Sequence, residues 1–267
     1  MIVESGGIES PYDLLADVYD RIYSTDLNDR IDEAAILSGL ITSYSPDAKT
    51  ILDLGSGTGT VFKQLSEVVK LDEMVGVEQS SKMIERAHVN VPSAEFIQGD
   101  ITDFAVEKRF DVVTCLFDTI NHIRTAPGWE KVFCGAEQHL KPGGIFIFDM
   151  VTERLLRDIA RSKSFTTSFS GGVCSFDMTS IGGAQYRSDF QITADDWPNE
   201  PTRASIVETS FPIVPVLRSL KKFLKPKVIF DHGAALRNDH SSWPKVTNAT
   251  GRVMVLGFKA SEAEDTI

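Results

Sequence analysis

The sequence ILDLGSGTG at residues 51–59 is an apolar run that passes directly into a glycine-rich segment. The run up to Leu54 is typical of a buried strand, and the residues after Gly59 are typical of a helix. Glycine lets the backbone approach a ligand without a Cβ clash, and α/β sheets bind ligands at the carboxyl ends of their strands. The stretch therefore predicts an α/β fold with a ligand site after this strand. Glycines that only tighten a strand–helix connection would give the same pattern.

Short apolar runs alternate with longer amphipathic ones around this stretch, which predicts a parallel sheet with crossover helices. The expected strands are Thr50–Leu54, Met74–Glu78, Glu95–Gln98, Phe110–Leu116 and Gly144–Asp149. Helices are expected over residues 11–23 and 29–43, after Ser80 or Ser81, and from Pro127 to the chain-reversing segment Lys141-Pro142-Gly143-Gly144.

After Asp149 the apolar period changes from helical to twofold, and Gly171-Gly172 and Gly182-Gly183 are turn signals between the alternating runs. Residues 164–211 are therefore interpreted as an antiparallel meander. A helix near Ile213–Leu224 and strands at Lys227–Asp231 and Arg252–Lys259 resume the α/β pattern. The predicted organisation is a ligand-binding core over 1–150, an inserted lid over 160–211, and the rest of the core over 212–267.

Composition limits the classes of partner. The 267 residues carry 38 acidic and 27 basic side chains, a formal charge of -11, which would repel a nucleic-acid backbone. Three separated cysteines favour neither a disulfide framework nor a zinc site. The first residues lack the pattern of a signal peptide, and no segment approaches ~18 consecutive apolar residues. We expect a cytoplasmic protein with a small-molecule partner and without nucleic-acid, membrane or metal binding.

Two carboxylates define the ligand further. Glu78 ends the second expected strand, 23 residues after Gly55, where an acid can accept hydrogen bonds from both hydroxyls of a ribose. Asp100 follows the third expected strand, where it can accept from the amine of adenine. A dinucleotide site would need the spacing GxGxxG, but Thr60 stands at the third glycine position. The pattern favours an adenosine-like ligand, and a nicotinamide oxidoreductase is a remote alternative.

Five segments in order resemble the class I S-adenosylmethionine-dependent methyltransferases; they are residues 53–59, 75–80, 99–101, 110–113 and 140–144. The resemblance implies a Rossmann-like α/β fold with a mostly parallel seven-stranded sheet, an antiparallel lid after the fifth strand, and S-adenosylmethionine as cofactor. The cofactor-binding residues that it implies are Tyr19, Asp53, Gly55, Ser56, Gly57, Gly59, Glu78, Gln79, Met83, Asp100, Ile101 and Leu116. Met83 could equally be a core residue of its helix.

Residues 12–20 and 115–123 look like the small-molecule N-methyltransferases, above all those that dimethylate nucleotide-linked amino sugars. This resemblance implies that His122 orients or deprotonates the amine and that Tyr12 gives the substrate a phenolic hydrogen bond. Methyl transfer is an in-line displacement and requires no metal. An O- or C-methyltransferase could use His122 as base equally well, and a binding protein without turnover is a third possibility. A homodimer is possible, and residues 232–250 depart from the pattern.

Overall fold

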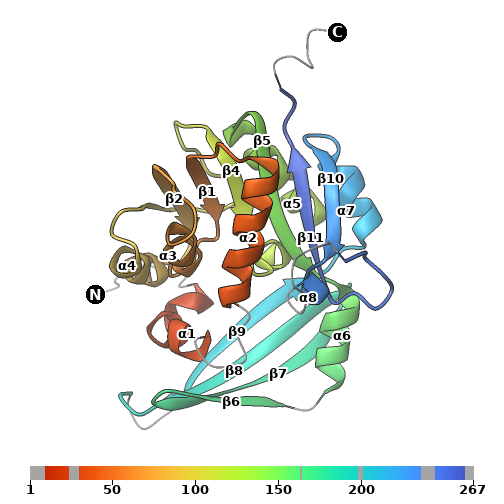
Figure 1. Cartoon of the computed structure of the whole chain (residues 1–267). Coiled ribbons are helices and arrows are strands. Elements are labelled where there is room, and N and C mark those ends of the chain that lie inside the picture. Colours follow the sequence, from red (N-terminus) through yellow and green to blue (C-terminus); the bar gives the residue numbers. More distant parts are fainter. Residues whose placement is uncertain (1–9, 24–29, 163, 198–200, 236–243, 262–267) are drawn as a thin grey trace, which may run out of the picture.

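The structure, a computed structural model, describes residues 10–23, 30–162, 164–197, 201–235 and 244–261. It contains two sheets (Figure 1). The larger has seven strands in the order β10-β11-β5-β4-β1-β2-β3, and the smaller has four in the order β6-β7-β8-β9. None of the helices in these ranges is long and apolar enough to cross a membrane.

The larger sheet is parallel from β3 to β5 and antiparallel where β11 pairs with β5 and β10. Its strands are β1 (Thr50–Leu54), β2 (Glu73–Glu78), β3 (Glu95–Gln98), β4 (Phe110–Cys115), β5 (Leu140–Val151), β10 (Lys225–Asp231) and β11 (Arg252–Phe258). This arrangement confirms the predicted mostly parallel seven-stranded sheet.

Helices cover both faces of this sheet and bury two separate apolar clusters. One face is covered by α2 (Arg30–Tyr44), α3 (Thr60–Ser66), α4 (Ser81–Asn90) and α8 (His232–Ala235), and the other by α5 (Ala126–His139) and α7 (Ile213–Leu220). Along β1 the side chains alternate between the clusters, because Ile51 packs with Leu40 on one face and Leu52 packs with Phe133 on the other. The core sheet is therefore the middle layer of three.

The smaller sheet is an antiparallel meander that follows β5 and α6 (Glu153–Arg161). Its strands are β6 (Phe165–Phe169), β7 (Gly172–Gly182), β8 (Gln185–Ala194) and β9 (Thr202–Thr209). The predicted antiparallel insertion is thus present, and we call this sheet the lid. Its first two turns lie at Ser170–Gly171 and Gly183–Ala184, each one residue away from the predicted glycine pair. The division of the chain at 150, 160 and 212 stays a prediction.

The N-terminal segment lies between the lid and the core sheet's helices (Figure 1). The helix expected over 11–23 is interrupted: η1 (Pro11–Leu14) is a short 3-10 helix, and α1 (Ala16–Tyr23) follows it. Ser10 caps η1 in a reciprocal capping box with Asp13. Leu15 and Val18 are buried against apolar residues of the lid and of α4. This segment therefore joins the two sheets.

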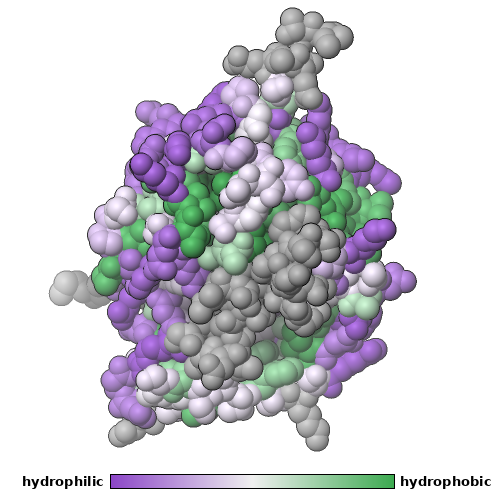
Figure 2. Space-filling view, viewed as in Figure 1, coloured by the Kyte–Doolittle hydropathy of each residue, from purple (hydrophilic) through white to green (hydrophobic). Residues whose placement is uncertain are grey.

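Hydrophilic residues cover much of the surface in the view of Figure 2, with apolar side chains visible between them. The core beneath is closely filled, since Trp129, Phe62, Phe133 and Phe148 are each 2% exposed or less. Such burial of large aromatic rings is a main source of stability in an α/β domain of this size.

Candidate active site

A cleft lies at the carboxyl ends of β1, β2 and β4, beneath η1 and α1. Its empty space is about 950 Å³, including the part open to solvent, which is in the range of small-molecule sites. The predicted residues that line it are Tyr12, Tyr19, Asp53, Gly55, Ser56, Gly57, Glu78, Gln79, Met83, Asp100, Ile101, Leu116 and His122. All predicted site residues except Gly59 are therefore brought together in one cleft.

The glycine-rich turn has the backbone conformation that requires glycine. Gly55, Gly57 and Gly59 have φ values of +79°, +54° and +74°. A Cβ atom at Gly57 would meet nothing within 4 Å, so this residue presents bare backbone to open space. Gly59 instead precedes α3 at its N-cap, and a Cβ there would lie 3.1 Å from the Phe96 ring. Its role in the structure is therefore helix packing.

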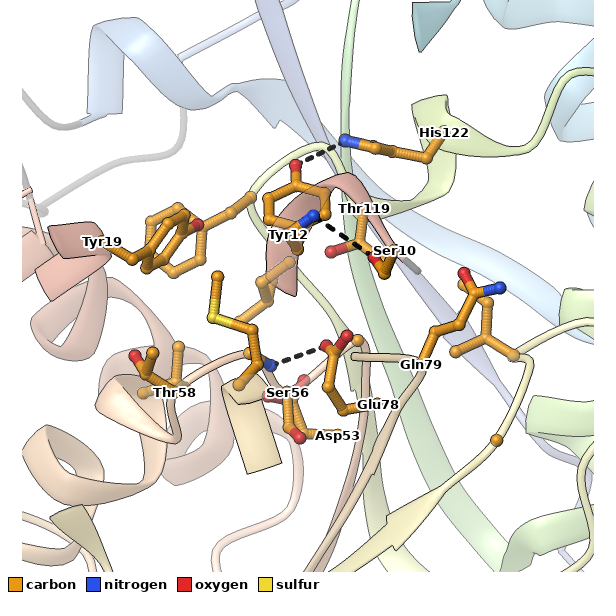
Figure 3. Close-up of a pocket in the computed structure, with 18 of the residues that line it drawn as sticks. Ser10, Tyr12, Tyr19, Asp53, Ser56, Thr58, Glu78, Gln79, Thr119 and His122 are labelled. Carbon is orange, nitrogen blue, oxygen red and sulfur yellow. Dashed lines mark hydrogen bonds between the residues drawn. The ribbon is translucent and has the colours of Figure 1, made fainter. Parts of the chain in front are cut away.

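Glu78 ties the second strand to the glycine-rich turn. Its carboxylate accepts a hydrogen bond from the Gly57 amide at 2.9 Å (Figure 3). It also accepts one from the Ser80 amide at 2.9 Å. Burial raises the pKa of Glu78, and hydrogen bonds from the backbone amides of Ser80, Gly57 and Gln79 act in the opposite direction. Each carboxylate oxygen keeps acceptor capacity beyond the one amide that it binds. The group can therefore still accept hydroxyl groups of a ligand.

Asp53 lies at the base of the same cleft and is 3% exposed. The Thr114 hydroxyl donates to it at 2.7 Å. Burial raises the pKa of Asp53 to about 6, although the Thr114 hydrogen bond lowers it. This carboxyl is therefore partly protonated at weakly acidic pH.

The far end of the cleft is formed by residues after β2 and β3. Asp100 and Ile101 follow β3, and the Asp100 carboxylate accepts from the Thr102 amide at 2.7 Å. Met83 lines the cleft and is also 1% exposed within the cluster beneath the N-terminal segment. The two roles considered for Met83, ligand contact and core packing, are therefore compatible.

Tyr12 and His122 meet above the cleft, from elements that are 110 residues apart. The Tyr12 hydroxyl lies 2.6 Å from His122 Nε2, and the two rings are tilted by 43° (Figure 3). On the other side of the imidazole, Nδ1 lies 3.2 Å from the Asp118 carbonyl oxygen. A proton on Nδ1 can donate to that oxygen, which in the neutral ring leaves Nε2 to accept from the Tyr12 hydroxyl. The contacts therefore orient both side chains.

Three aspartates hold the N-terminal segment over the cleft; they belong to the segment 12–20 that carries the family resemblance, but the sequence analysis gave them no role. Asp20 accepts from Thr58 Oγ1 at 2.5 Å and from Asn90 Nδ2 at 2.9 Å. Asp13 accepts from the Ser80 hydroxyl at 2.6 Å, and Asp17 pairs with Arg86. The cleft is also lined by residues that were not predicted; these include Ser10, Thr58, Thr60, Val61, Phe117, Thr119 and Ile123. Several are immediate neighbours of predicted residues.

The histidines of the late segment lie away from this cleft or outside the described residues. His232 is completely buried and its Nε2 lies 2.8 Å from the Glu33 carboxylate, which is 3% exposed. His240 belongs to residues 236–243, outside the described ranges. Neither histidine therefore adds to the described cleft.

Comparison with known proteins identifies a family model that matches part of the chain and solved structures that share its fold. Residues 51–144 match the family model described as "Methyltransferase domain", and this match confirms the resemblance predicted from the five segments. The Rossmann-like fold with its antiparallel lid is shared with the crystal structure of Streptomyces venezuelae DesVI. That match has a TM-score of 0.75 at 21% identity and covers 92% of this chain and 98% of that one. The fold is therefore that of the class I methyltransferases.

Two relatives with assigned reactions are similar over part of their length. The dTDP-3-amino-3,4,6-trideoxy-alpha-D-glucopyranose N,N-dimethyltransferase of Streptomyces venezuelae is 30% identical over 134 residues, 50% of this chain and 56% of that protein. The dTDP-4-amino-2,3,4,6-tetradeoxy-D-glucose N,N-dimethyltransferase of Saccharopolyspora spinosa is 34% identical, over 50% of this chain and 53% of that protein. The chain thus matches about half the length of these relatives.

Proposed function

We propose that this protein transfers a methyl group from S-adenosylmethionine to a nitrogen atom of a small metabolite such as an amino sugar. The observation that carries the proposal is the Tyr12–His122 pair, which lies on the same cleft as the glycine-rich turn and Glu78. A cofactor site and a proton-accepting pair are the two parts that amine methylation needs. The two relatives, both N,N-dimethyltransferases of amino sugars, support nitrogen as the acceptor.

The residues present fit an adenosine-containing cofactor. Gly57 leaves open space where a Cβ would project, and Glu78 offers acceptor capacity for ribose hydroxyls next to it. Asp100 and Ile101 line the cleft after β3 and would recognise the adenine, and Tyr19 lines it from α1. When bound, S-adenosylmethionine supplies an electrophilic methyl group on a positively charged sulfur. The carboxylates of Asp53 and Glu78 suit that charge.

The chain's own residues would then align the acceptor and accept its proton. His122 and Tyr12 hold the amine so that its lone pair points into the cofactor cleft. An ammonium substrate must lose a proton before it can react, and the hydrogen-bonded imidazole can accept that proton. The N-terminal segment lies over the cleft and the lid packs against η1 and η2, and together they would limit the access of water to the reacting atoms.

The test is mass spectrometry after incubation of the protein and S-adenosylmethionine with a panel of amino sugars and small amines, with phenols as controls. We expect products heavier by one or two methyl groups with an amine and none with the phenols. Methylation of phenols alone would refute nitrogen as the acceptor. The homodimer that the sequence analysis left open is tested separately by light scattering after gel filtration, where a monomer mass would refute it.

A further inference from the structure

A cluster of charged side chains, two of them buried and two partly exposed, lies behind the loop that carries His122. We call it the charge cluster; its members are Asp118 before η2 (Thr119–His122), Asp149 on β5, Arg252 on β11 and Glu208 on lid strand β9. Arg252 pairs with Asp118 at 2.7 Å through Nη2 and with Asp149 through Nε. The cluster therefore joins the core sheet, the His122 loop and the lid.

Asp118 connects the cluster to His122 through its backbone. Its carbonyl oxygen lies 3.2 Å from His122 Nδ1 and accepts the Asn121 amide at 2.8 Å. Asp118 has φ +52° and the preceding Phe117 has φ +56°, conformations that cost free energy in residues other than glycine. The Asp118 amide donates to both oxygens of Asp149, at 3.3 and 3.2 Å. The cluster therefore holds the strained backbone that orients His122.

Glu208 brings the lid into this arrangement. It is 9% exposed on β9, a strand that packs against both η1 and η2. Next to it, the Thr209 carbonyl accepts from Asn121 Nδ2 at 2.9 Å, so this end of β9 is fixed to the residue before His122. Glu208 and Asp118 also share a side-chain hydrogen bond.

Charge balance shows which carboxyl group carries a proton. Arg252 is a single positive charge facing Asp149 and Asp118, so an ionised Glu208 would be a third carboxylate facing one cation. Burial, followed by the charge of Asp118, raises the pKa of Glu208 to about 8, and Arg252 lowers it only in part. Glu208 is therefore neutral at pH 7 and donates to Asp118.

We propose that Glu208 is a positioning residue that couples the lid to His122 through a carboxyl–carboxylate hydrogen bond to Asp118. The expected effect of Glu208 on methyl transfer rests on the proposed function. The hydrogen bond between Glu208 and Asp118 does not depend on that function. Among the described residues, the charged groups that act on Glu208 are Asp118 before η2 and Arg252 on β11, and Tyr186 lies opposite it on β8. His122 acts on Asp118, and η1, which carries Tyr12 and Asp13, packs against β9.

The sign of the pH dependence follows from the raised pKa. We call the lid docked when β9 packs against η1 and η2, and undocked when this contact is broken. The pKa of Glu208 is about 8 in the docked lid and would be near its ordinary value of 4.5 in the undocked lid. The docked form therefore binds the extra proton between these values, and docking weakens as pH rises through that range, by about tenfold per pH unit. Above pH 8 the docking equilibrium levels off, and the docked form itself loses the proton that joins Glu208 to Asp118.

The experiment compares the wild-type protein with Glu208→Gln and Glu208→Ala. Gln keeps a donor of the same shape that cannot ionise, and Ala removes the donor. Hydrogen exchange of the backbone over residues 117–123 is followed by mass spectrometry between pH 5.5 and 9. We expect exchange in the wild type, divided by exchange in Glu208→Gln at the same pH, to rise up to pH 8 and then level off. Glu208→Ala should exchange faster than Glu208→Gln at pH 6.

A second measurement uses methyl transfer. The ratio of wild-type kcat/KM to that of Glu208→Gln cancels the ionisation of the amine substrate, and we expect it to fall above pH 8. An exchange ratio that does not change with pH, or equal exchange in the Gln and Ala variants, would overturn the inference. If the exchange ratio changes as expected but no amine is methylated, the proposed function fails and the Glu208–Asp118 hydrogen bond is supported.

Discussion

The Tyr12–His122 hydrogen bond is the contact in the cleft whose contribution can be isolated most cleanly. Tyr12→Phe removes only the hydroxyl that lies 2.6 Å from His122 Nε2 and keeps the ring that packs beneath the lid. Tyr44→Phe is a matched control, because the Tyr44 ring packs against Phe258 and does not line the cleft. The variants therefore differ in which hydroxyl is lost.

The expected magnitude follows from the type of bond. A neutral, partly buried hydrogen bond contributes about 0.5–1.5 kcal/mol, which corresponds to a loss of about 2- to 13-fold in kcat/KM. His122→Ala removes the proposed proton acceptor and should cost about a hundredfold or more. If Tyr12 acts by orienting His122, its hydroxyl has no further effect once the imidazole is gone. The double variant should then be no slower than His122→Ala alone.

The assay is a double-mutant cycle on kcat/KM with an amine substrate identified by mass spectrometry. We expect the coupling free energy between the two substitutions to equal the full effect of Tyr12→Phe, and Tyr44→Phe to leave the rate unchanged. If Tyr12→Phe slows the His122→Ala protein by the same factor as it slows the wild type, the two side chains act independently. That result would refute the orienting role of Tyr12.

Three further predictions concern the cofactor cleft. Glu78→Gln loses a charge-assisted acceptor for the Gly57 amide, so S-adenosylhomocysteine should bind about 10- to 100-fold more weakly by calorimetry. Gly55→Ala places a Cβ 2.4 Å from the Thr119 methyl at φ +79° and should destabilise the protein by more than about 2 kcal/mol in urea unfolding. Gly57→Ala meets no atom within 4 Å and should cost only about 1–2 kcal/mol. The pKa of Asp53 rises from 3.8 to about 6 on folding, so the folded state binds the extra proton between these values. The free energy of unfolding should therefore fall by about 3 kcal/mol as the pH is raised from 4 to 6, and Asp53→Asn should remove this decrease.

Each of these predictions has an outcome that contradicts it. Unchanged affinity in Glu78→Gln would show that the carboxylate does not support the cofactor site. Equal destabilisation by Gly55→Ala and Gly57→Ala would mean that the Thr119 contact has no energetic consequence. A wild-type stability curve parallel to that of Asp53→Asn would show that Asp53 ionises as in the unfolded chain.

The core and most of the cleft could be predicted because their signals are local. The apolar run before Gly55 and the acid at the end of β2 each indicate a strand and its carboxyl end, and parallel strands bring such ends to one edge. Gly59 was included among the cofactor-binding residues because of the family resemblance. In the structure its neighbour is Phe96 on the third strand, a packing contact that spacing does not reveal.

The contacts that close the site could not be predicted because they join distant segments. Asp20 meets Thr58 across 38 residues, and Glu208 meets Asp118 across the whole lid. Neither pair has a spacing rule, since each depends on how the N-terminal segment and the lid dock. The start of β5 was also misplaced. Leu140 pairs with Phe110, and the strand continues through the predicted chain reversal at 141–144 after an irregularity in register.

The most direct test of the account is calorimetric titration of the wild-type protein with S-adenosylhomocysteine and, separately, with NAD. The glycine-rich turn, Glu78 and Asp100 together predict saturable binding of one S-adenosylhomocysteine per chain and no binding of NAD. Binding of NAD in its place, or no binding of S-adenosylhomocysteine, would contradict the assignment of the cleft as a methyl-donor site.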